Sequence, residues 1–187
     1  MNLQKLFEMQ RQLDEHIEKE HPRQDGEDRL AKKILALQVE LGELCNCWRG
    51  FKFWSKDQKP RTVLTEIPSY AGIPFFADAK TRNPLLEEFA DCLHFLLSIG
   101  LELNFTDIDV WKVKEATTTN QFIECFGTIY NMHFQKRVTG EVPIEMYEHL
   151  FACFIGLGEM LGFTWEQIGE AYMRKNRENH QRQESGY

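Results

Sequence analysis

Apolar residues recur every three or four positions along most of the chain, which is the period of one face of an α-helix. In residues 28–48, for example, Leu30, Ile34 and Leu37 fall on one side of the predicted helix. No segment alternates with the period of a strand, so the sequence predicts an all-α fold. The predicted helices are 2–20, 28–48, 84–103, a short one from Thr106 or Asp107 to Val113, 118–137, 143–161, and a last one from Thr164 into the C-terminal tail.

Local signals mark the ends of several predicted helices. Asn83 before Pro84 is typical of a helix N-cap followed by proline at the first helical position. Thr164 and Gln167 have the spacing of a capping box. The segment 49–83 contains several glycines and prolines and many aromatic residues, which is typical of a long loop. We therefore expect one all-α domain over residues 1–187, with a long loop or insertion at about 49–83.

The composition limits the classes of protein that fit this pattern. The chain has 187 residues, of which 42% are hydrophobic, enough for one packed domain. It has no run of about 18 apolar residues, and its first residues lack the apolar centre of a signal peptide, so we expect a cytoplasmic protein without a membrane partner. A net charge of −7 disfavours binding to nucleic acid, and five cysteines without a C-x-x-C pair favour reduced thiols.

Two acidic motifs are the first candidates for chemistry. Glu40 and Glu43 are three positions apart, as are Glu88 and Asp91, so each pair lies on one face of its predicted helix. Both pairs lie among apolar residues, where neighbouring carboxylates repel one another and lose hydration. Because Mg²⁺ prefers oxygen ligands and commonly joins carboxylates to substrate phosphates, a Mg²⁺ site would explain this arrangement.

Spacing alone leaves two other interpretations open. Glutamate favours helices, so paired glutamates also occur on solvated faces, as we expect for Glu145 and Glu148. Asp91 and His94 resemble the carboxylate-x-x-His element of di-iron helical bundles. That site needs a second such element, which the motif at 40–43 does not supply.

The last residues add cations to an acidic chain. Lys175, Asn179 and Arg182 are separated by four and three positions, which aligns them on one face of a helix. Such a face can bind a triphosphate, because lysine brings a point charge and arginine a planar fork. Cations also gather at helix C-termini through the helix dipole, so the pattern alone leaves both interpretations open.

Four segments match the pattern of one family. They are MQRQLDEHI at 9–17, ELGELCNCWRGFKFWS at 40–55, EEFADCLHFLLSIG at 87–100 and KNRENHQRQESGY at 175–187. Through them the chain resembles the dimeric all-α dUTPases, which are related to the MazG-like pyrophosphatases. The acidic motifs are common to the wider group, whereas K-N-x-x-N-x-x-R-Q before a final Gly-Tyr is more specific to the dUTPases. The resemblance implies a multi-helix bundle of the all-α nucleoside-triphosphate pyrophosphatase type that forms a homodimer.

The resemblance also implies roles for individual residues. Glu40, Glu43, Glu88 and Asp91 would bind two or three Mg²⁺ ions, for which Mn²⁺ can substitute. The phosphates would contact the C-terminal motif, the nucleobase would contact the first helix, and further residues would line the pocket. In that order, the expected substrate-binding residues are Lys175, Asn179, Arg182 and Tyr187; Gln10 and Asp14; and Lys52, Trp54 and His94.

Two features depart from the family pattern. Asp14 stands where some members carry asparagine, and an ionised carboxylate can accept the N3–H of uracil but cannot donate to its carbonyls. Specificity for dCTP or for a broader set of nucleotides therefore stays open. The gap between Glu43 and Glu88 is longer than in compact relatives, so the insertion at 57–83 could be a lid, a dimer contact or a surface for another protein.

These observations predict a Mg²⁺-dependent enzyme that hydrolyses dUTP to dUMP and pyrophosphate, with dUDP as a further candidate substrate. A metal-activated water would attack the α-phosphate, and Glu43 is the expected catalytic base. The alternatives are a related pyrophosphatase that acts on dCTP or non-standard nucleotides, and a helical regulatory or binding protein with a vestigial site.

Overall fold

The computed structural model describes residues 2–70 and 73–186. This part of the chain forms six α-helices, so the all-α prediction is confirmed. They are α1 (Leu3–Glu20), α2 (Arg29–Trp48), α3 (Pro84–Leu103), α4 (Thr118–Thr139), α5 (Ile144–Met160) and α6 (Trp165–Glu184). The first five start and end within two residues of the predicted bounds.

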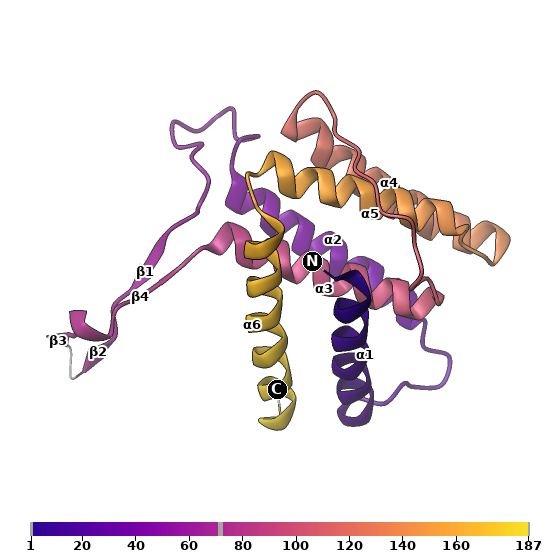
Figure 1. Cartoon of the computed structure of the whole chain (residues 1–187), viewed down its shortest axis with the longest axis horizontal. Coiled ribbons are helices and arrows are strands. Elements are labelled where there is room, and N and C mark those ends of the chain that lie inside the picture. The colour runs from indigo at the N-terminus through magenta and orange to yellow at the C-terminus, as the bar shows by residue number, and fades with distance from the viewer. Residues whose placement is uncertain (1, 71–72, 187) are drawn as a thin grey trace.

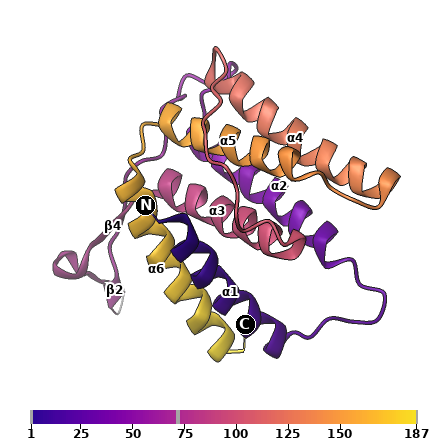
Figure 2. The same ribbon diagram turned by 45° about the vertical axis from the view of Figure 1, so that its right-hand side comes forward.

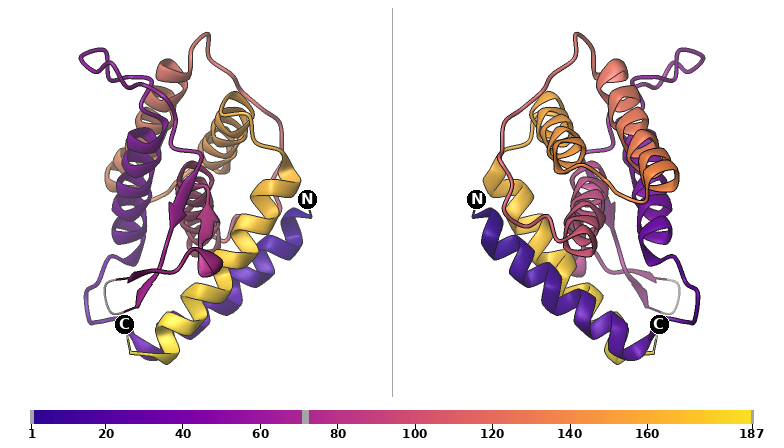
Figure 3. Two further views of the ribbon diagram at one scale, coloured as in Figure 1. Left: turned by 90° about the vertical axis from the view of Figure 1, so that its left-hand side faces the viewer. Right: turned by 90° about the vertical axis from the view of Figure 1, so that its right-hand side faces the viewer.

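The central helix is α3, against which α1, α2, α5 and α6 all pack. Figure 3 shows it between α2 and α5. Its sequence is apolar on nearly every side, and buried residues such as Phe89, Leu93 and Leu96 face several neighbouring helices. As predicted, the Asn83 side chain caps its first turn, with Pro84 at the start.

Three helix pairings set the shape of the molecule. The helices α2 and α3 run in opposite directions and make the most extensive contact, and α4 and α5 form a second antiparallel pair (Figure 1). The helices α1 and α6 lie side by side and run in the same direction (Figure 2). Both also pack on α3. As a result, residues from the two ends of the chain meet on one face of the central helix.

The short helix predicted from Thr106 or Asp107 to Val113 is wrong. The segment has no regular secondary structure and bonds to other elements: the Val113 N–H donates to the carbonyl of Ala152 on α5 at 3.1 Å. The Val113 carbonyl in turn accepts from Gln121 Nε2 at 2.9 Å. Because these partners satisfy the N–H and the carbonyl of Val113, neither group needs a hydrogen bond within a helix.

The expectation of no strands is also corrected, in the insertion. Strand β1 (Leu64–Glu66) pairs antiparallel with β4 (Lys80–Arg82), and β2 (Ser69–Tyr70) with β3 (Ile73–Pro74). A short 3₁₀ helix, η1 (Phe76–Asp78), lies between β3 and β4. The ribbon extends away from the helices (Figure 1), and all residues of β1 and β4 are exposed. With neither face buried, these strands need no alternating pattern, which explains why periodicity misses them.

No helix in the described ranges is both long enough and apolar enough to cross a membrane. All five cysteines are free thiols; Cys92, Cys125 and Cys153 are buried, and Cys45 and Cys47 are partly exposed.

Candidate active site

The antiparallel contact between α2 and α3 brings the two acidic motifs together. Carboxylate oxygens of Glu40, Glu43 and Glu88 lie within 4.8 Å of one another. Glu40 and Glu88 are partly buried, whereas Glu43 is exposed. Three carboxylates that converge on one point form an all-oxygen donor set, which suits a hard divalent cation such as Mg²⁺ or Mn²⁺.

The fourth predicted carboxylate, Asp91, lies one turn after Glu88 at the contact with α6. Lys175 Nζ donates a hydrogen bond of 2.7 Å to Asp91 Oδ2, and both side chains are mostly buried. This pair joins the acidic motif of α3 to the cationic C-terminal motif. The two halves of the site predicted from sequence therefore touch each other directly.

Burial and mutual repulsion raise the pKa values of carboxyl groups in and beside the cluster. Burial raises the pKa of Glu40 to about 7, and the nearby charges of Asp91, Glu43 and Glu88 add to the effect. Burial also raises the pKa of Glu88, with Asp91 and Glu43 contributing. For Asp91 burial raises the pKa as well, while Lys175 opposes the shift. A bound cation would relieve both the repulsion and the lost hydration, so the residues fit a metal ion.

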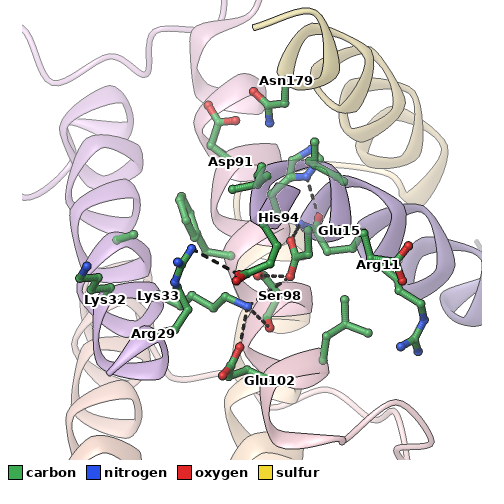
Figure 4. A pocket seen from close by; sticks show the side chains of 18 of the residues that line it. Arg11, Glu15, Arg29, Lys32, Lys33, Asp91, His94, Ser98, Glu102 and Asn179 are labelled. Carbon is green, nitrogen blue, oxygen red and sulfur yellow. Dashed lines mark hydrogen bonds and ion pairs between the residues drawn. The ribbon is translucent and has the colours of Figure 1, made fainter. Parts of the chain in front are cut away.

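A cavity of about 650 Å³ opens beside this cluster between α1, α2, α3 and α6. Glu40 and Asp91 line it, and so do Lys175, Asn179 and Arg182 from α6. Figure 4 shows Asp91 and Asn179 at one end and Glu102 at the other. Along α3 the cavity follows one helical face for about three turns, a length of roughly 16 Å.

A network of polar side chains forms one wall of the cavity. Gln10 Oε1 accepts from the Tyr172 hydroxyl at 2.9 Å and lies 2.8 Å from His94 Nδ1. Because an amide oxygen only accepts, Nδ1 carries the proton of His94 and Nε2 is an acceptor. Nε2 is buried and has no hydrogen-bond partner in the described ranges. Burial lowers the pKa of His94 to about 3, so the ring stays neutral.

Asp14 extends this network toward α2. Its Oδ1 accepts from Gln10 Nε2 at 2.7 Å, while Oδ2 accepts from Ser98 Oγ at 2.6 Å and from Lys33 Nζ at 3.2 Å. Lys33 also donates to Glu102 Oε2 at 3.0 Å (Figure 4). Asp14 thus accepts hydrogen bonds from three protein donors and also lines the cavity, and its predicted contact with the base stays a prediction.

Sequence reasoning missed Lys33, Ser98 and Glu102, which line the same cavity. A signal for the last two was present. Positions 91, 94, 98 and 102 are spaced by three or four residues, so they share the face of α3 that carries the predicted ligand. Lys33 gave no such signal, because it looks like an ordinary solvated lysine of α2.

Two predicted substrate-binding residues lie elsewhere. Lys52 and Trp54 are in the turns that follow α2 and do not belong to the described lining of the cavity. Trp54 is exposed and makes an edge contact with Phe53, while Lys52 Nζ lies 5.5 Å from the centre of the Phe51 ring. Tyr187 lies outside the described residues.

Comparison with known proteins identifies the family. A family model described as dUTPase matches residues 2–67 and 77–187, which include both acidic motifs and the C-terminal motif. No curated protein matches the chain at a significant level.

The raised pKa of Glu40 predicts how stability depends on pH without metal. Between the usual value of 4.5 and about 7, the folded state binds more protons at Glu40 than the unfolded state does. The melting temperature in EDTA should therefore fall as pH rises through this window. Excess Mg²⁺ should raise it most at the upper end of the window.

Thermal melts of variants across this pH range provide the control. Glu40→Gln should make the melting temperature in EDTA fall less steeply with pH, because a neutral amide has no proton to lose. Glu145→Gln, at an exposed position of α5, should keep the wild-type dependence on pH. Identical slopes in wild type and Glu40→Gln would contradict the assignment.

Proposed function

Because the chain belongs to the dUTPase family and is a dUTP diphosphatase, we propose that it cleaves dUTP to dUMP and pyrophosphate with Mg²⁺ bound by Glu40, Glu43, Glu88 and Asp91. dUTPases generally use a divalent metal. The observation that carries the proposal is the convergence of three carboxylates beside a cavity that Lys175 and Arg182 line from the other side. Two or three ions fit four carboxylates and a triphosphate, and Mn²⁺ can substitute because it prefers the same ligands.

When bound, Mg²⁺ would neutralise phosphate oxygens and lower the pKa of a coordinated water. The chain's own contribution starts with Glu43, the exposed carboxylate of the cluster, which solvent can reach. Glu43 would accept a proton from the water whose oxygen bonds to the α-phosphorus. The bond from that phosphorus to the bridging oxygen then breaks, and pyrophosphate leaves.

The cations of α6 would bind the phosphate chain. The protein carries a net charge of −7, so binding a triphosphate requires positive charge placed locally. Lys175 donates to Asp91 in the structure, and with Asp91 engaged as a metal ligand its ammonium group would be available to a phosphate oxygen. Asn179 and Arg182 follow on the same helix and line the same cavity.

The nucleoside would occupy the part of the cavity beyond Asp91, along α3. His94 lines this part of the cavity, and its buried Nε2, which has no hydrogen-bond partner among the described residues, would suit a donor such as the N3–H of uracil. Asp14 would act through the groups it holds, by fixing Gln10, Ser98 and Lys33. The contacts predicted for Lys52, Trp54 and Tyr187 stay proposals from the family resemblance.

Assays with a panel of deoxynucleoside triphosphates test which nucleotide is the substrate, and the Glu43→Gln variant tests the catalytic base. Pyrophosphate release should be fastest with dUTP, slow with dCTP, and absent in EDTA. Glu43→Gln should lower kcat by about 10²–10⁴-fold, the usual contribution of a general base. Glu145→Gln removes the same charge at an exposed position of α5 and should leave kcat unchanged. Equal rates for dUTP and dCTP would refute the preference for uracil. An active Glu43→Gln enzyme would refute the role of Glu43 as general base.

Removal of Lys175 tests phosphate recognition. Lys175→Ala should weaken binding of a non-hydrolysable dUTP analogue at saturating Mg²⁺ by about 10- to 100-fold, since it removes a hydrogen bond between charged groups. Binding of deoxyuridine, measured by calorimetry, should change much less. The matched control is Arg177→Ala, which removes an exposed cation from the same helix outside the cavity lining. Similar losses for both ligands would show that Lys175 supports folding rather than phosphate binding.

We propose that the protein is a homodimer, with α4 in the interface. Apolar side chains at Ile123, Tyr130, Phe134 and Val138 are 52–65% exposed and follow one face of this helix. A long apolar stripe on a free helix face is typical of a surface that another protein covers. A second copy of the chain is the occupant that the family resemblance implies.

Light scattering during size-exclusion chromatography measures this assembly directly. Wild type should elute as a dimer and Phe134→Glu as a monomer, because a charge cannot be buried without a partner. Gln181→Glu, an exposed position on α6, serves as the charge control and should stay dimeric. A wild-type monomer would disprove the proposal.

A further inference from the structure

A second cluster of metal-ligating side chains lies between α4 and α5. It consists of Glu124 on α4 and of His149 and Cys153, which are one turn apart on α5. None of the three lines the cavity described above. On α4, Glu124 faces α5 together with Gln121 and Thr128, a face distinct from the exposed apolar stripe. The cluster therefore has no part in the proposed hydrolysis.

The three ligand atoms have the spacing of a tetrahedral metal site. Bonds of about 2.0–2.1 Å to nitrogen and oxygen and about 2.3 Å to sulfur put neighbouring ligands roughly 3.4 Å (N to O) and 3.6 Å (N to S) apart. In the structure His149 Nε2 lies 3.1 Å from Glu124 Oε1 and 3.5 Å from Cys153 Sγ. All three atoms lie within 4.8 Å of one another. Small movements would place them around one ion.

Hydrogen bonds alone do not account for the positions of these three side chains. A neutral imidazole nitrogen either donates one proton or offers one lone pair. Nε2 can therefore donate to Glu124 or accept from the thiol of Cys153, but it cannot do both. Both partners nevertheless converge on Nε2. A cation at the centre would be shared by all three atoms.

The surroundings of the cluster hold it in place. Gln121 Nε2 donates to the carbonyl of Cys153 at 2.7 Å, and Gln121 is fully buried. The Thr128 hydroxyl lies 3.5 Å from the same oxygen of Glu124 that faces His149. Partners of this kind orient ligands in metal sites. The Glu124 and His149 side chains are about 40% exposed, so an ion can enter from solvent and a water can complete the coordination.

We propose that Glu124, His149 and Cys153 bind a Zn²⁺ ion that fastens α4 to α5, with water as the fourth ligand. Thiolate and imidazole ligands select a softer ion than the all-oxygen cluster of the active site does, so the two sites would separate Zn²⁺ from Mg²⁺.

Cobalt(II) is the spectroscopic probe for this site, because it accepts the same ligands and is coloured. Full-length protein in excess Mg²⁺, which occupies the carboxylate cluster, is titrated with Co²⁺. The expected result is a thiolate-to-metal charge-transfer band and the intense visible bands of a four-coordinate ion, saturating at one equivalent per chain. Zn²⁺ should bleach these bands and raise the melting temperature. No charge-transfer band in the wild type would overturn the proposal.

Variants assign the ligands. Cys153→Ser should abolish the charge-transfer band, whereas Cys47→Ser, at a partly exposed thiol elsewhere, should keep it. Glu124→Gln and His149→Gln change half-exposed positions and spare the core, so they remain informative if Cys153→Ser does not fold. Each should weaken Zn²⁺ binding at least tenfold in competition with a chromophoric chelator. Unchanged affinity in both variants would refute the site.

Discussion

The contact between α2 and α3 is the constraint on which the rest of the molecule depends. Apolar side chains set the antiparallel register of the two helices, and that register places Glu43 near Glu88 and Glu40 near Asp91. The packing that stabilises the core therefore also forces carboxylates together, which destabilises them as anions. A cation bound at this interface would relieve the repulsion, and that relief would become part of its binding free energy.

The C-terminal helix depends on the same centre through a single aromatic residue. Tyr172 is fully buried, its ring stacks on His94 of α3 at 4.1 Å between centroids, and its hydroxyl bonds to Gln10 of α1. Lys175 and Asn179 follow about one and two turns later on α6, so the buried tyrosine fixes where they enter the cavity. In this way the core positions Lys175 and Asn179, which would otherwise belong to a loose, solvated tail.

Local patterns predicted much of this structure, and the reasons for the failures are physical. Asn83 and Thr164 mark helix starts because capping depends on a few adjacent residues. The helix predicted up to Val113 is wrong because the Val113 N–H bonds to Ala152 on another helix, a partner that a local sequence pattern does not reveal. The paired acidic motifs could be placed on helix faces from spacing, but their convergence depends on how the helices pack. The contact of Lys33 with the network around Asp14 has the same origin, since it joins α2 to α1.

The hydrogen bond between Gln10 and His94 fixes which ring nitrogen of His94 is a donor and which is an acceptor on this wall of the cavity. Because Gln10 Oε1 can only accept, it fixes the tautomer of His94, and the low pKa of the ring keeps it neutral down to strongly acid conditions. The donor and acceptor pattern of the His94 ring is therefore the same at any pH well above 3. Acidification would therefore protonate Glu40 of the carboxylate cluster well before it protonates His94. With the nucleoside bound along this wall, as proposed above, nucleotide choice and cleavage would respond separately to pH.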